Sequence, residues 1–229
     1  MPKVDLYRNV HMGQRMRLFS LAAELGAADM AQPDAIAEQV HRVLAMTEEL
    51  REHADTEDTF IHVLLRDRAP EAADALDAEH LRLDAAFAVL DDRARALPGT
   101  SAGQLREAQH ELYLALNEVI SAYLVHLYLE ETVAMPALWQ KASDDELAGI
   151  FSAFQASRTP EQAVTDLQKM LPALPPATRL AIARSVTNAA GEEYAGEMLL
   201  KISRTLSASQ RSRLYADLGV SEAWALPEA

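Results

Sequence analysis

Cysteine is absent from this chain of 229 residues, and glycine (8), proline (10) and aromatic residues (6%) are scarce. Without cysteine there is no disulfide scaffold, thiolate metal site, thiol redox centre or cysteine nucleophile. Few glycines and prolines over this length indicate few breaks in the secondary structure. Any metal would have to be bound through imidazole and carboxylate groups, and the chain has 7 histidines.

Positive charge is also in deficit, because 21 Lys and Arg face 35 Asp and Glu, for a net charge of −14. Such a charge argues against unassisted binding to nucleic acid or anionic membranes. The hydrophobic share of 49% is too high for a disordered acidic chain. The N-terminus lacks the apolar core of a signal peptide, and no window approaches about 18 uncharged apolar residues. We therefore expect a cytoplasmic protein with neither membrane nor nucleic acid as a partner.

Strand patterns are missing as well, because β-branched residues never alternate in runs, whereas strong helix formers dominate. Breakers and caps predict four long helices, over about 4–25, 33–68, 70–98 and 101–142, with Pro136 as a kink or break near the end. Short loops make such helices antiparallel neighbours, so residues 1–142 are predicted to form an up-down-up-down four-helix bundle.

The C-terminal part, residues 143–229, is predicted to hold shorter helices that begin at caps such as Ser143 and Thr159. It contains no histidine, and its acidic residues are scattered. We interpret it as a helical extension without ligands that packs against the bundle or forms a homodimer.

Two copies of one motif carry the chemistry, His53-x-x-x-Glu57 and His126-x-x-x-Glu130. Residues four apart on a helix lie about 40° apart around its axis and one turn along it. An imidazole and a carboxylate then point into the same space, as a metal ion requires.

A lone histidine precedes each motif at a similar distance, His11 by 42 residues and His80 by 46. Antiparallel helices would bring both halves together at the centre of the bundle. Four histidines and two glutamates converging there would form a dinuclear metal site.

The other histidines fail this test, because on continuous helices they lie about 120–180° from the nearest motif: His41, His62 and His110. The neighbouring acids Glu52, Asp58 and Glu131 lie about 100° or more from the ligand face. We expect the three histidines to face away from the site, on the surface or in packing between helices, and we leave the three acids out of the site because they point away from its ligand face.

The set His11, His53-x-x-x-Glu57, His80 and His126-x-x-x-Glu130 resembles the hemerythrin-like family, also called the HHE cation-binding domain, over about residues 1–141. The segments that follow the two motifs also resemble the family's sequences at these places: Phe60-Ile61-His62-Val63-Leu64-Leu65 and Met135-Pro136-Ala137-Leu138-Trp139. The resemblance implies a non-haem centre of two iron ions, oxo- or hydroxo-bridged, with manganese as the alternative metal. It also implies that Glu57 and Glu130 bridge the ions and that the histidines bind terminally.

Two departures disfavour a simple reversible oxygen carrier. Carriers of the family have a second histidine four residues from His80, where this chain has Leu76 and Asp84. Their last carboxylate follows its histidine by five residues, whereas Glu130 follows by four. Asp84 is either a further ligand, a hydrogen-bond acceptor for an imidazole or a solvated acid.

Two tyrosines, Tyr7 and Tyr123, lie close to the ligand face and either donate hydrogen bonds at the site or fill the core.

Three functions stay open at this point. The first is a di-iron protein that binds dioxygen, nitric oxide or peroxide as a sensor, scavenger or carrier. The second is an enzyme, namely an oxidase, a peroxide-decomposing catalyst or a ferroxidase, with the tyrosines and Asp84 as proton donors. The third is a structural helical module in which the histidine pattern is coincidental.

Overall fold

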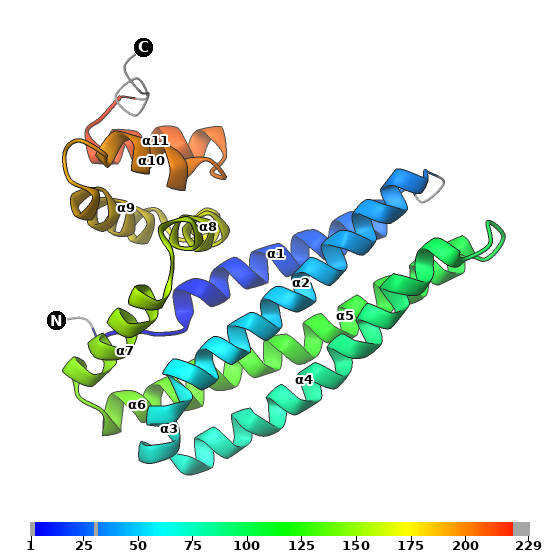
Figure 1. Ribbon diagram of the computed structural model, residues 1–229, viewed down its shortest axis with the longest axis horizontal. Coiled ribbons are helices and arrows are strands. Elements are labelled where there is room, and N and C mark those ends of the chain that lie inside the picture. The colour runs from blue at the N-terminus through cyan, green and yellow to red at the C-terminus, as the bar shows by residue number, and fades with distance from the viewer. Residues whose placement is uncertain (1–2, 30–31, 222–229) are drawn as a thin grey trace. The chain divides into compact units, whose positions relative to one another are not determined.

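A computed structural model describes residues 3–29 and 32–221, and these residues form helices with no strand among them (Figure 1). The prediction of an all-helical protein is confirmed. The chain divides into two compact units, one of Met1–Tyr7 with Arg17–Phe154 and one of Arg8–Met16 with Gln155–Ala229. The sequence-based division into residues 1–142 and 143–229 stays a prediction.

The first unit contains the longest helices, and its α1 (Arg8–Ala27) belongs to it from Arg17 onward. The elements that follow are α2 (Pro33–Phe60), α3 (His62–Arg68), α4 (Pro70–Ala96), the 3₁₀ turn η1 (Leu97–Gly99), α5 (Leu105–Leu129), the π-helical turn η2 (Glu130–Ala134), α6 (Met135–Lys141) and α7 (Asp144–Ser157). Helix α4 packs against both α2 and α5, and Figure 1 shows these three running alongside one another.

Two apolar clusters form the core of this unit. The first joins α1, α2, α4 and α5 through residues such as Leu18, Leu50, Leu83 and Leu116. The second joins the N-terminal segment, α3, the start of α4 and α6, and it includes Leu76. Along α4, His80 lies between Leu76 of the second cluster and Leu83 of the first, on the same buried stripe. A polar residue thus occupies a core position at the junction of the two clusters.

The predicted second helix is interrupted, because α2 ends at Phe60 and α3 begins at His62. Ile61 between them is buried, and its N–H donates to the carbonyl of Glu57 at 2.8 Å. Thr59, Phe60 and Ile61 are three consecutive residues of low helix propensity, which favours a break at this point. The break changes the direction of every side chain after it relative to the continuous helix that the sequence predicted.

The last long helix widens instead of breaking. Pro136 has no N–H to donate, and the five residues Glu130–Ala134 form a π-helical turn just before its helix, α6. The N-terminal segment is held on α6, because the Trp139 indole N–H donates to the carbonyl of Val4 at 2.7 Å and the Leu6 N–H contacts Met135 Sδ at 3.4 Å. These contacts fix the segment that carries Tyr7.

Two predicted helix caps are confirmed. Ser143 and Glu146 exchange hydrogen bonds at the start of α7, and Thr159 forms a capping box at the start of α8. The helix that the sequence predicts from about residue 101 begins only at Leu105, and the Ser101 hydroxyl donates to the side chain of Gln104 at 2.8 Å.

The second unit consists of short helices around a third apolar cluster. It contains the first residues of α1, the end of α7, and then α8 (Pro160–Met170), the 3₁₀ turn η3 (Leu171–Ala173), α9 (Pro176–Ala190), α10 (Ala195–Ser203) and α11 (Ala208–Leu218). Arg179 is buried and donates to the carbonyls of Leu171 and Leu174 at 3.0 and 2.8 Å, so its guanidinium closes the turn before α9.

Gly13 marks a close helix contact inside the second unit. A Cβ at this position would lie 2.9 Å from the backbone oxygen of Lys169 in α8. Gly13→Ala therefore forces the backbones apart, and we expect it to lower the free energy of unfolding by about 1–3 kcal/mol. Gly149→Ala is the matched control, because nothing lies within 4 Å of that Cβ and alanine favours the helix interior by about 0.5–1 kcal/mol. Urea denaturation that ranks Gly13→Ala at or above wild type would contradict this contact.

One stretch of the described residues, Leu105–Lys141, is long and apolar enough to cross a membrane by length and composition. Its best 18-residue window has a mean hydropathy of 1.4 and is 39% buried. The expectation that the chain has no transmembrane helix stays a prediction. Core helices of soluble proteins pass the same test, and α5 contributes Leu112, Leu116 and Leu127 to the first apolar cluster.

Candidate metal centre

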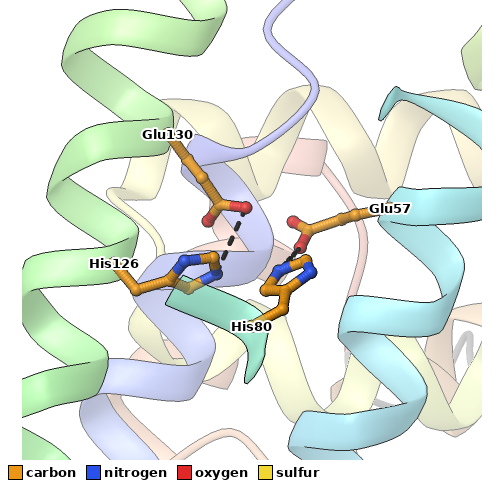
Figure 2. Close-up of side chains that lie close together, drawn as sticks. All are labelled: Glu57, His80, His126 and Glu130. Atoms are coloured by element: carbon orange, nitrogen blue, oxygen red, sulfur yellow. Dashed lines mark ion pairs between the residues drawn. The ribbon is translucent and has the colours of Figure 1, made fainter. Parts of the chain in front are cut away.

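Four buried side chains from three helices and the π-helical turn converge inside the first unit (Figure 2). Glu57 comes from α2, His80 from α4, His126 from α5 and Glu130 from the first residue of η2. At least 90% of the surface of each residue is buried. One ligand atom from each lies within 4.8 Å of the other three, so this set can hold a metal ion.

The distances within the set suit shared coordination. His126 Nε2 lies 3.3 Å from Glu130 Oε1, and His80 Nε2 lies 3.9 Å from Glu57 Oε2. Metal–ligand bonds of about 2.0–2.2 Å place neighbouring ligand atoms about 3–4 Å apart. The rings of His80 and His126 are tilted by 57°, with centroids 4.7 Å apart, so neither ring covers the other.

Burial is the physical reason to expect a cation here. Glu57 and Glu130 are 1% and 0% exposed, and taking a carboxylate out of water is costly unless it is compensated. Both ring nitrogens of His80 are buried with no hydrogen-bond partner, although each faces a carboxylate. A metal ion would satisfy Nε2 of His80 and balance the charge of the two glutamates.

His53 extends the set along α2. Its Nε2 lies 2.9 Å from Glu57 Oε1, which is the pairing that the four-residue spacing predicts. Its side chain is 12% exposed. His11 lies on α1 in the part that belongs to the second unit, so its predicted role as a ligand stays a prediction.

The prediction that His62 and Asp58 point away from the site is wrong. His62 is fully buried, its Nδ1 lies 2.9 Å from Asp58 Oδ1, and its ring stacks on that of His80 at 5.4 Å with an interplanar angle of 21°. Asp58, His62 and His80 form a further group with metal-ligand spacing. The helix break at Ile61 turns the His62 side chain inward. On a continuous helix this side chain would point away from the site. Asp58-x-x-x-His62 was the available signal, because it repeats the four-residue spacing in reverse order.

The remaining candidates divide by burial. Tyr7 and Tyr123 are buried, and the Tyr123 ring centroid lies 5.7 Å from that of His126. Asp84 is exposed, which fits the solvated acid among the interpretations of this residue. The expectation for His41 and His110 holds, since both are exposed.

Two groups near the site have shifted pKa values. Burial, and then the Glu130 and Glu57 carboxylates, raise the pKa of the Tyr7 phenol well above its ordinary value, so this hydroxyl keeps its proton. Burial lowers the pKa of the His62 imidazole below its ordinary value, although Glu57 and Asp58 act in the opposite direction. His62 is therefore neutral at pH 7.

The lowered pKa of His62 predicts acid sensitivity in the metal-free protein. Below pH 6.5 the unfolded chain binds this proton before the folded chain does, so stability falls as the pH drops from about 6.5 toward the folded pKa. Urea denaturation of the metal-free protein at pH 7.5 and 5.5 should show a larger loss for wild type than for His62→Gln. His41→Gln, at an exposed histidine, should behave as wild type. Equal losses in wild type and His62→Gln would contradict the assignment.

We compared the chain with known proteins at the level of family, sequence and structure. No protein-family model, no curated protein and no solved structure matches the chain.

Proposed function

We propose that this protein is a metal-binding protein whose centre is formed by Glu57, His80, His126 and Glu130. The observation that carries the proposal is the burial of two carboxylates and two imidazoles with ligand atoms within 4.8 Å of one another. Imidazole and carboxylate ligands suit iron or manganese.

The finer proposal is a hemerythrin-like protein with two iron ions in an up-down-up-down four-helix bundle. The apolar cluster shared by α1, α2, α4 and α5 supports the bundle. His53 beside Glu57 supports a second ion, which the sequence pattern completes with His11. Glu57 and Glu130 would then be shared between the ions. A bound pair of iron ions supplies redox-active positions for a small ligand such as dioxygen, nitric oxide or peroxide.

The protein's own side chains would shape how such a ligand is received. The raised pKa of Tyr7 keeps its phenol protonated, so its hydroxyl can donate a hydrogen bond to a buried acceptor. The apolar residues of the two clusters on either side exclude water. A small neutral guest is therefore favoured over a charged one. We propose a sensor, scavenger or carrier.

The test is to add dioxygen or nitric oxide to the reduced, iron-loaded protein without other reagents. We expect new absorption bands between the near-ultraviolet and the visible, and we expect them to be lost in His126→Gln. An iron-loaded protein with an unchanged spectrum would contradict small-ligand binding while leaving metal binding intact.

A di-iron enzyme, as an oxidase, a peroxide-decomposing catalyst or a ferroxidase, is the second candidate. The buried Tyr7 phenol favours it, because a phenol that stays protonated near Glu130 and Glu57 can donate a hydrogen bond to a bound substrate. Tyr7→Phe should then lower the rate of peroxide or ferrous iron turnover about 10²-fold or more, with metal content unchanged. No turnover by the loaded wild-type protein would dismiss these activities.

A homodimer through the C-terminal helices and a cytoplasmic location complete the proposal. Light scattering should give a mass of twice 25.2 kDa for the full chain. A chain truncated after residue 154 should be a monomer. A full chain that stays monomeric would contradict the dimer.

A further inference from the structure

The proposed metal ligand His80 lies between two carboxylates, and each of its ring nitrogens faces a different one. Its Nε2 faces Glu57 Oε2 at 3.9 Å, on the side of the candidate metal centre. Its other ring nitrogen, Nδ1, faces Asp58 Oδ2 at 3.7 Å. A neutral imidazole carries one proton, and the nitrogen that binds a metal must be the one without it.

Asp58 is itself held in place. Its Oδ1 accepts hydrogen bonds from His62 Nδ1 at 2.9 Å and from Arg66 Nη2 at 3.2 Å. Arg66 is in turn fixed by Asp77 on α4, at 2.8 Å. These contacts occupy Oδ1 and leave Oδ2 directed at His80, while the stacked ring of His62 fixes the plane of the His80 ring.

We propose that Asp58 is a positioning residue for His80, which keeps the imidazole proton on Nδ1 and thereby presents Nε2 to the metal. His62 and Arg66 hold the Asp58 carboxylate in the required orientation. The inference rests on the proposed metal centre, but the position of the proton can be measured without any metal.

A third cation bound by Asp58, His62 and His80 is the competing interpretation of the same group. The 2.9 Å contact between His62 and Asp58 is a hydrogen-bond distance, and a guanidinium already provides positive charge on that carboxylate. The group therefore has its own compensation, which favours positioning over ligation.

The first experiment locates the proton by long-range ¹H–¹⁵N NMR of histidine-labelled, metal-free protein, with the His80 signals identified by their loss in His80→Gln. In wild type we expect the proton on Nδ1. In Asp58→Ala the carboxylate of Glu57, which faces Nε2, remains, so we expect the proton to move to Nε2. Asp58→Asn keeps an acceptor oxygen and should restore the Nδ1–H form. A His80 proton whose position does not respond to Asp58→Ala would overturn the inference.

The second experiment measures metal affinity by titration with Fe²⁺ under anaerobic conditions. We expect Asp58→Ala to raise Kd about 10–100-fold with the number of bound ions unchanged, and Asp58→Asn to lie between it and wild type. Asp55→Ala is the matched control, because Asp55 is exposed on the same helix. Loss of one bound ion in Asp58→Ala would make Asp58 a ligand and overturn the inference. If wild type bound no metal while the proton still moved, the metal centre would fail and the role of Asp58 toward His80 would stand.

Discussion

We expect saturation with Fe²⁺ or Mn²⁺ to raise the melting temperature of the metal-free protein by about 8–16 °C. At 1,000 times Kd, a ligand that binds only the folded state adds about 4 kcal/mol, and each kcal/mol shifts the melting temperature by about 2–4 °C in a domain of this size. The gain comes from the buried glutamates, whose charge the metal-free protein must otherwise hold in a medium of low dielectric constant.

Differential scanning fluorimetry under anaerobic conditions measures this shift. His126→Gln keeps the size and polarity of the side chain but removes a ligand, so the shift should fall to a small fraction of the wild-type value. His110→Gln is the matched control, because His110 is an exposed histidine on the same helix. The same shift in wild type and His126→Gln would mean that the metal binds elsewhere.

Replacing a buried carboxylate should separate stability from metal binding. Glu130→Gln removes a charge that is fully buried and whose oxygen lies within 4.8 Å of a ligand atom of Glu57. Like charges at this distance repel, and each is desolvated. We expect the metal-free variant to be about 1–4 kcal/mol more stable than metal-free wild type, because the neutral amide removes both costs. Its metal affinity should fall about 100-fold or more.

Urea denaturation with a chelator present measures the first effect, and metal titration measures the second. Glu118→Gln is the control, since Glu118 is exposed on α5, which leads into η2, and should change neither quantity. A Glu130→Gln protein that is less stable without metal and still binds it with wild-type affinity would contradict the proposed role of this carboxylate.

The sequence predicts those parts of the candidate site that lie on regular helices. The pairs His53 with Glu57 and His126 with Glu130 follow from the four-residue spacing alone, and the structure has both. His80 was found because it repeats the order of the first half of the chain, and it lies on the buried stripe of α4. Composition was sufficient for the all-helical class.

The sequence does not predict the features that depend on irregular helix geometry. It also does not predict which of two residues, three or four positions from His80, is buried. A break at Ile61 turns His62 inward, and no calculation on a continuous helix can give that direction. The role of Asp84, four residues after His80, was left open by the sequence; the buried stripe of α4 continues at Leu83 instead, which leaves Asp84 exposed. The packing of Gly13 against α8 joins segments far apart in the chain, and such contacts leave no local pattern.

Metal analysis by mass spectrometry of the purified wild-type chain and the double variant His80→Gln/His126→Gln tests the central claim most directly. After reconstitution with iron and gel filtration, we predict two ions per chain in wild type and at most one in the double variant, with helical content unchanged by circular dichroism. A wild-type chain that retains no metal, or a double variant that retains as much as wild type, would contradict a metal centre at these buried residues.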